Sequence, residues 1–292
     1  MIQDYVMFTG VNILLAWSVY IILLSGSLSF GNGAFMAIGA YLSGVLTVKF
    51  AVPLLIAVLV AGILTGFFGV LVGFPALRTR GVYLILVTVG IAASVRTAIE
   101  AIDYVGGVRG FGGLAGANPW QIAVLVAIVG GVLWMVSRSP LQRILDAVRE
   151  DEQVARALGI NVVQVKLVSF GTGAALAAIA GGFYGHYMMF LRPDEFDIML
   201  SVYIVFYVIL GGTNNLWGPA LGAAFLTLAP EFIRGLDTWR PTVYGLLIVL
   251  LLLIRPEGLL TFRLVTARAA HLRRATRDSD MPARNRSPEA KR

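Results

Sequence analysis

Residues 139–166 read SPLQRILDAVREDEQVARALGINVVQVK and form the one long polar segment between two apolar ones in the chain. Ser139 followed by Pro140 predicts a helix start, because a hydroxyl cap and a proline in the first turn both favour one. Gly159 predicts a helix end, and Asn161 predicts the cap of the next helix. Apolar side chains recur between them at helical spacing, with a break near Asp151 (Leu141, Ile144, Leu145, Val148, Ala155, Leu158). We expect one amphipathic helix, or two short ones, outside the bilayer; an inert surface helix fits this periodicity equally well.

The composition of the chain predicts an integral membrane protein. Of its 292 residues, 58% are hydrophobic and 13% are charged, with a mean hydropathy of +0.82. Charged residues make up about a quarter of an ordinary soluble domain. The chain has no cysteine and only two histidines, which excludes disulfides and makes a histidine metal site improbable. The net charge is +7, and the basic residues lie in loops and in the tail. This distribution is typical of basic residues that set the orientation of a membrane protein, and it argues against nucleic-acid binding.

Apolar runs of about 20 residues, the length that crosses a bilayer, divide the chain into membrane spans. We expect an all-α polytopic helical bundle of about nine spans, within a range of eight to ten. The transmembrane domain covers residues 1–262, with the amphipathic segment at 139–160, and residues 263–292 form a basic, partly disordered cytoplasmic tail. The expected spans are 5–24, 33–50, 53–73, 82–101, 119–137, 164–190, 199–213, 217–234 and 240–254.

The distribution of basic residues predicts the orientation in the membrane. With nine crossings, 17 of the 23 Lys and Arg residues fall on the side of residues 139–166. Positive residues concentrate in cytoplasmic loops. We therefore expect this segment and the C-terminus in the cytoplasm, and the N-terminus outside.

Two polar, glycine-containing stretches interrupt the spans: residues 25–33 (SGSLSFGNG) and residues 211–219 (GGTNNLWGP). Non-helical backbone at membrane depth persists where protein buries it or where it lines a watery cavity. Broken helices of this kind often mark a transport pathway. The alternative, an ordinary turn at the membrane surface, stays open on spacing alone.

Charged loops on the outer side offer a surface to a soluble partner. Residues 101–119 contain GGVRGFGGLAG, and residues 191–197 read LRPDEFD. Simple solvated loops are an equally good interpretation. The residues expected to meet a partner are Arg109, Asp194, Glu195 and Asp197.

Motifs of catalysis and ATP binding are absent from the sequence. No GxxxxGK[ST] loop is present to hold ATP phosphates, and no HExxH, GxSxG or paired catalytic carboxylates stand out. We therefore expect a non-enzyme. Carboxylates are also scarce within the spans, which argues against a stand-alone transporter driven by protons or sodium.

The longer motifs resemble one family. Residues 153–159 are similar to the EAAxxxG loop of ATP-binding-cassette (ABC) importer permeases, with Gln153 and Val154 in place of the Glu and the first Ala. Residues 143–167, 27–41 (SLSFGNGAFMAIGAY), 74–88 and 208–223 (VILGGTNNLWGPALGA) resemble the branched-chain amino acid permeases of the LivH/LivM type, and LivM more closely. Asn32 stands where many relatives carry a histidine.

This resemblance implies a type II-like importer fold in the bacterial inner membrane, with a function in uptake of branched-chain or related hydrophobic amino acids. It implies a second homologous permease, two cytoplasmic ATPase subunits and a periplasmic substrate-binding protein as partners, and no nucleic acid. This chain would bind no cofactor, since ATP and Mg would sit on the ATPases. Relatives that take up urea, short amides or aromatic acids leave the substrate open, and a stand-alone secondary transporter is the remoter alternative.

The resemblance also implies roles for individual residues. The amphipathic segment becomes a coupling helix that docks on an ATPase, and the two breaks become parts of the translocation pathway. The expected coupling residues are Arg149, Glu150, Asp151, Glu152, Ala155 and Gly159. The expected pathway residues are Ser29, Asn32, Gly33, Gly211, Gly212 and Asn214.

Overall fold

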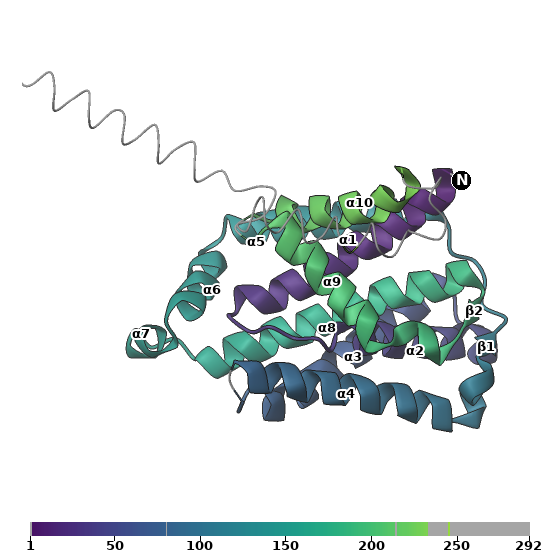
Figure 1. Ribbon diagram of the computed structural model, residues 1–292, viewed down its shortest axis with the longest axis horizontal. Coiled ribbons are helices and arrows are strands. Elements are labelled where there is room, and N and C mark those ends of the chain that lie inside the picture. The colour runs from purple at the N-terminus through teal and green to yellow at the C-terminus, as the bar shows by residue number, and fades with distance from the viewer. Residues whose placement is uncertain (1, 80, 214, 233–244, 246–292) are drawn as a thin grey trace, which may run out of the picture.

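Eight apolar helices run alongside one another in the computed structural model of the chain (Figure 1). The structure describes residues 2–79, 81–213, 215–232 and 245. The eight helices are α1 (Ile2–Leu24), α2 (Asn32–Phe50), α3 (Leu54–Ala76), α4 (Val82–Ala101), α5 (Pro119–Ser137), α8 (Val162–Met188), α9 (Ile198–Gly211) and α10 (Trp217–Phe232).

These helices confirm the helical fold that the apolar runs predict. Six of them, α1 to α5 and α8, are long and apolar enough to cross a membrane. Helix α9 has 14 residues and is shorter than a full span, and the described part of α10 has 16 residues. The ninth expected span (240–254) and the tail (263–292) lie outside the described residues.

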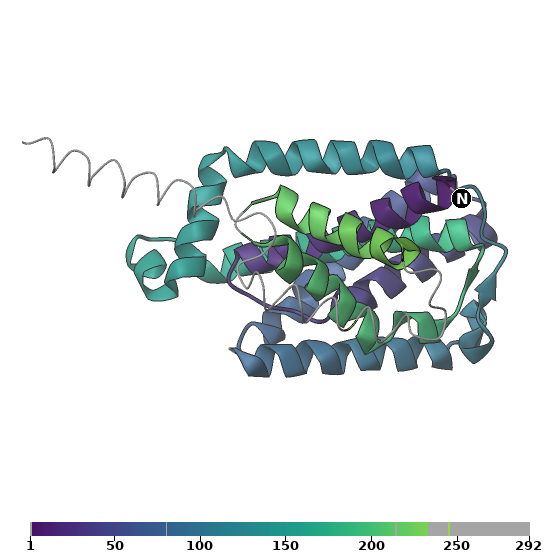
Figure 2. The ribbon, with the colours of Figure 1, turned by 45° about the horizontal axis from the view of Figure 1, so that its top comes forward.

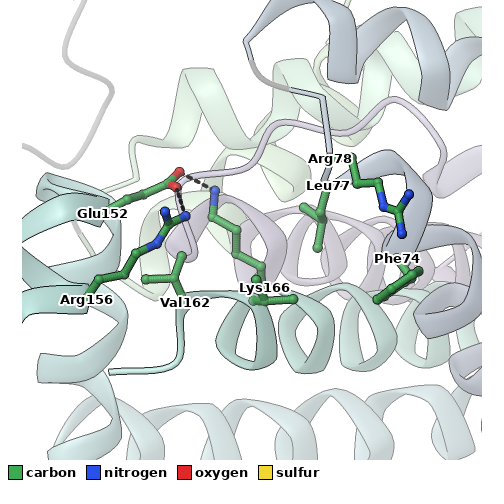
Figure 3. Close-up of a pocket in the computed structure, with 8 residues that line it drawn as sticks. Phe74, Leu77, Arg78, Glu152, Arg156, Val162 and Lys166 are labelled. Atoms are coloured by element: carbon green, nitrogen blue, oxygen red, sulfur yellow. Dashed lines mark hydrogen bonds and ion pairs between the residues drawn. The ribbon is translucent and has the colours of Figure 1, made fainter. Parts of the chain in front are cut away.

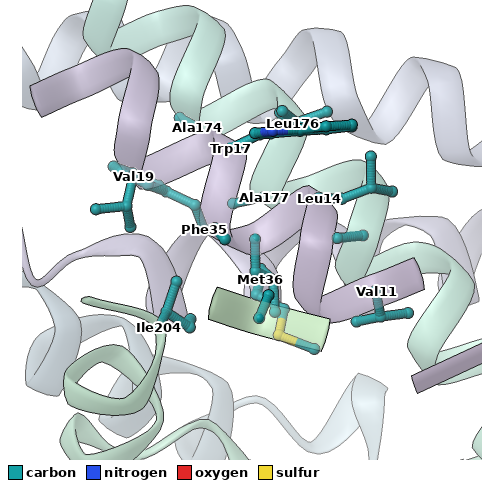
Figure 4. Close-up of a cluster of buried hydrophobic side chains, with 14 of the residues drawn as sticks. Val11, Leu14, Trp17, Val19, Phe35, Met36, Ala174, Leu176, Ala177 and Ile204 are labelled. Atoms are coloured by element: carbon teal, nitrogen blue, oxygen red, sulfur yellow. The ribbon is translucent and has the colours of Figure 1, made fainter. Parts of the chain in front are cut away.

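Helix α8 packs against α1, α2 and α3 through small residues. A methyl group added at Gly39 of α2 would meet the backbone of Ala178, and one added at Gly181 would meet the backbone of Met36. Close backbone approach of this kind is how small residues hold membrane helices together. Larger side chains fill the space between α1, α2, α8 and α9, including Trp17, Phe35 and Ile204 (Figure 4).

Helices α4 and α5 lie at opposite edges of the bundle (Figure 2). In an apolar stretch of 18 residues, only 22% of the residues of α4 and 11% of those of α5 are buried within the chain. Exposed apolar side chains such as Val124 and Ile128 of α5 therefore face outward. Such a face is suited to contact with membrane lipid or with another subunit.

Substitution of alanine for Gly69 of α3 is expected to destabilise the bundle. The added methyl group would overlap Cβ of Ala174 on α8, and overpacking of this kind costs about 1–3 kcal/mol. The matched control is Gly90→Ala in α4, where the added methyl group meets nothing within 4 Å. In thermal unfolding of the purified protein, Gly69→Ala should lower Tm and Gly90→Ala should not; equal Tm values would contradict the packing.

The two ends of the bundle differ. At one end α6 (Pro140–Glu150) and α7 (Glu152–Ala157) project from it (Figure 1). At the other end β1 (Phe111–Gly112) pairs antiparallel with β2 (Phe190–Leu191), with Phe111 opposite Leu191. Three short 3-10 helices accompany the strands: η1 (Asp103–Val105), η2 (Gly107–Arg109) and η3 (Pro193–Phe196). The strand pair joins the two charged loops on one surface, as their sequence predicts.

Candidate coupling site and translocation pathway

The amphipathic segment forms two short helices, α6 and α7, and a side chain caps the start of each one. The cap of α6 by Ser139 is predicted from the sequence, whereas the cap of α7 by Asp151 is not. Oγ of Ser139 accepts a hydrogen bond from the backbone N–H of Leu141 at 3.3 Å, which starts α6. Oδ1 of Asp151 accepts from the N–H of Gln153 at 2.7 Å and of Val154 at 3.2 Å, which starts α7. Asp151 therefore stabilises the start of α7 by satisfying two of its free N–H groups.

The turn after α7 depends on Gly159. Its φ of +83° lies in the left-handed region, which glycine adopts at little cost. Oδ1 of Asn161 then accepts from the N–H of Gln164 at 3.1 Å and starts α8. Only residues 158–161 connect α7 to the central helix α8. A connection this short limits how far the projecting helices can move relative to the bundle.

A small apolar cluster of Val148, Ala155 and Val162 fixes α6 and α7 to the start of α8. Ala155 is 0% exposed, so its side chain packs inside the chain and is not available to a partner. In contrast, Val154 and Leu158 are 55% and 72% exposed. They are four residues apart and share one helical face. We call these two residues the apolar coupling face. Leu158 belongs to the apolar stripe predicted from the sequence, and Val154 does not.

An ion-pair cluster reinforces the attachment of α7 to α8 (Figure 3). The carboxylate of Glu152 lies 2.5 Å from Nζ of Lys166 and 3.4 Å from Nη2 of Arg156. Lys166 belongs to α8, and its side chain is only 13% exposed. The Glu152 carboxylate therefore joins the two helices, while Glu150 at the end of α6 stays exposed.

Both predicted breaks in the membrane helices reach the C-terminal end of α6. The guanidinium of Arg149 donates to Oγ1 of Thr213 at 3.0 Å and to its backbone oxygen at 3.5 Å, in the turn between α9 and α10. A methyl group added at Gly26, in the first break, would lie 3.4 Å from Cα of Arg149. The structure thus brings the segment predicted to couple to an ATPase into contact with both segments predicted to form the pathway. Thr213 lies within the GGTNN motif but is not among the residues predicted for the pathway.

The first break runs back into the bundle. Nδ2 of Asn32 donates to Oγ of Ser18 at 2.7 Å, and the N–H of Phe30 donates to Oγ1 of Thr88 at 3.1 Å. Ser18 precedes the end of α1 by six residues, a depth of about 9 Å along the helix. The N–H of Gly33 donates to Oγ of Ser201 at 3.0 Å. Non-helical backbone at this depth is sheltered by protein, unlike a turn at the membrane surface.

Polar groups concentrate along this buried break. Oγ of Ser29 accepts from the N–H of Gly31 at 3.1 Å, and both Ser29 and Asn32 are 1% exposed. Oγ of Ser27 and Oδ1 of Asn32 have no hydrogen-bond partner among the described residues. Buried polar atoms normally have one, so these atoms are suited to water or to a polar solute.

At the second break, α9 and α10 pack closely against each other. A methyl group added at Gly211 would meet the carbonyl of Gly218, so Gly211 permits the close approach of the two helices. Gly212 has a φ of +89° and allows the turn. Asn214 lies outside the described residues.

At the opposite end, the residues predicted to meet a soluble partner lie in or near the paired loops. Arg109 is exposed in η2, and Asp194 pairs with Arg192 at 2.9 Å. Oε2 of Glu195 accepts from the Tyr184 hydroxyl at 3.3 Å, and desolvation raises the pKa of the Glu195 carboxyl. Asp197 differs, because its Oδ1 caps α9 by accepting from the N–H of Leu200 at 3.0 Å.

The multi-pass helical bundle, its buried polar break and the projecting helix pair define a membrane transport protein. Residues 1–255 match the family described as branched-chain amino acid transport system / permease component, and the chain belongs to this family. The chain is therefore the permease component of a transport system, a multi-pass protein of the inner membrane.

Individual relatives carry related names. The chain is 29% identical to the high-affinity branched-chain amino acid transport system permease protein LivM of Escherichia coli K12, over 88% of this chain and 69% of that one. It is 31% identical to the permease protein BraD of a Pseudomonas aeruginosa system of the same description, over 48% and 47%. It is 25% identical to the autoinducer 2 import system permease protein LsrC of Escherichia coli O9:H4, over 82% and 74%. No solved structure matches the chain.

Proposed function

We propose that this chain is the transmembrane permease subunit of an ABC importer for branched-chain amino acids, and that it couples their passage to ATP hydrolysis by separate subunits. The observation that carries the proposal is the contact of Arg149 with Thr213, which joins the projecting helix α6 to a break in the membrane helices. Similarity to the LivM permeases supports the choice of substrate.

The two ends of the bundle suit different partners. We assign α6 and α7 to the cytoplasmic side, where one of the two ATPase subunits docks on the apolar coupling face; the excess of basic residues on this side supports the assignment. The loops joined by β1 and β2 face outward and receive a substrate-binding protein, through exposed charges such as Arg109 and Asp194. The N-terminus lies on this outer side. A second, homologous permease completes the membrane part.

Motion of the ATPases reaches the pathway through contacts of this chain. The cluster around Ala155 and the Glu152–Lys166 ion pair make α7 and the start of α8 move together. Arg149 transmits the displacement of α6 to the turn between α9 and α10, and Gly26 brings the first break against the same helix. ATP and Mg bind to the ATPase subunits, since the chain has no phosphate-binding loop.

The buried break from Ser27 to Asn32 is the proposed polar section of the pathway. Oδ1 of Asn32 is an acceptor suited to an ammonium group, and the break lies beside the N-terminus of α2. The positive end of a half-helix in a membrane is suited to a carboxylate. The zwitterion of an amino acid presents both groups.

Uptake into proteoliposomes tests the function. The complete complex, with its ATPases, second permease and binding protein, should take up radiolabelled leucine only when ATP is present on the ATPase side. Omission of the ATPase subunits should abolish uptake. Leucine uptake that persists without them would contradict the proposal and favour the stand-alone transporter.

The binding protein tests the substrate class separately. Leucine, isoleucine and valine should raise its Tm, since a ligand that binds only the folded state stabilises that state. Urea, short amides and aromatic acids serve as the comparison set. If only compounds of that set raised the Tm of the binding protein, the proposed substrate would be wrong. The proposed coupling mechanism would not be affected.

A further inference from the structure

A cavity of about 350 Å³ lies between the end of α3, helix α7 and the first turn of α8 (Figure 3). The described residues that line it include three basic side chains, Arg78, Arg156 and Lys166, and one acidic side chain, Glu152. The positive charge therefore exceeds the negative charge, and the cavity favours an anion.

The basic groups keep hydrogen-bond donors for such a ligand. Lys166 and Arg156 approach the Glu152 carboxylate from one side of the cavity. Arg78 lies on the other side, with its guanidinium 5.1 Å from the centre of the Phe74 ring. A guanidinium has five N–H donors and an ammonium has three, so one carboxylate cannot occupy them all. A phosphate group, with several acceptor oxygens, matches this set.

An exposed apolar stripe on α3 leads to the cavity. Ile63, Phe67, Leu71 and Phe74 follow one another at intervals of three or four residues and are 52–72% exposed. This spacing places them on one helical face. Arg78 follows Phe74 by four residues, so the stripe ends at the basic cavity. The glycines of α3 lie on the other side of the helix, against α8.

We propose that the cavity binds the phosphate of an anionic phospholipid such as phosphatidylglycerol, with the acyl chains along the exposed stripe of α3. A helix of 23 residues spans the bilayer, so a cavity at its end lies at the level of the lipid headgroups. Free phosphate has the same headgroup chemistry, but it would make no use of the stripe. The proposal concerns lipid binding alone and does not depend on the transported substrate.

Native mass spectrometry of the full chain in detergent tests the site with phosphatidylglycerol and phosphatidylcholine as probes. The wild type should retain one phosphatidylglycerol more strongly than phosphatidylcholine. Each basic residue near a membrane surface is worth about fivefold in binding, so Arg78→Gln with Arg156→Gln should weaken retention about 25-fold. Both side chains are exposed, so the double variant should keep the Tm of the wild type in the absence of added lipid.

The matched control is Arg138→Gln with Arg143→Gln, which removes two exposed basic residues at the same end of the bundle but outside the cavity lining. This variant should retain phosphatidylglycerol as the wild type does. Equal losses in both double variants, or equal retention of the two lipids, would overturn the proposal. A separate thermal titration with inorganic phosphate distinguishes the source: a Tm rise equal to that given by short-chain phosphatidylglycerol at the same concentration would rule out the lipid.

Discussion

Leu158→Glu is expected to abolish ATP-dependent leucine uptake in the assembled importer. Leu158 is 72% exposed and shares the apolar coupling face with Val154. The few residues that dominate the binding energy of an interface each contribute about 2 kcal/mol or more, so if Leu158 is one of them, a glutamate in its place should weaken ATPase binding by about 30-fold. Co-purification of the ATPase subunits with the tagged permease measures the loss directly.

The control for this variant is Gln164→Glu, which adds the same charge in the exposed first turn of α8. It should leave ATPase co-purification and uptake near the wild-type values. Because Leu158 is exposed, the permease carrying Leu158→Glu should keep its Tm. A normal yield of ATPase with Leu158→Glu would show that α7 is not the docking element.

The membrane helices are predictable from sequence because their signal is local. A run of about 20 apolar residues predicts a membrane helix without reference to the rest of the chain. Helix α8, for example, is observed at Val162–Met188, where the sequence predicts 164–190. The predicted helix caps Ser139 and Asn161 are local too, since each side chain binds a backbone N–H two or three residues away.

The course of the first break is not predictable in the same way. Residues 25–33 turn inward because the hydroxyls of Ser18, Thr88 and Ser201, on three other helices, accept hydrogen bonds from them. Nothing in the local sequence distinguishes this from a turn at the membrane surface. The partners of the coupling residues are equally distant in sequence: Thr213 follows Arg149 by 64 residues. The sequence pattern within one segment shows Arg149 and Glu152 as polar residues, but it does not identify the residue that each side chain contacts.

The structure separates the roles of Arg149 and Glu152, which the sequence groups together. Glu152 stabilises the attachment of α7 to α8 through Lys166, whereas Arg149 links α6 to the α9–α10 turn. Arg149→Ala should therefore leave the ATPases bound and hydrolysing ATP while leucine uptake falls about tenfold, within the 0.5–2 kcal/mol that single residues contribute to coupling. Thr213→Val should give the same phenotype, since it removes the hydroxyl that the guanidinium contacts.

A double-mutant cycle tests whether Arg149 and Thr213 act as one link. If they do, the combined variant should be no worse than either single variant, because each substitution already breaks the contact. Exposed polar contacts contribute only about 1 kcal/mol to stability, so Tm should change little and the loss of uptake is not one of folding. Arg143→Ala, an exposed arginine earlier on the same helix, is the control and should transport normally. Additive losses in the double variant would mean that the two side chains affect transport independently, and that the motion of α6 reaches the pathway by another contact.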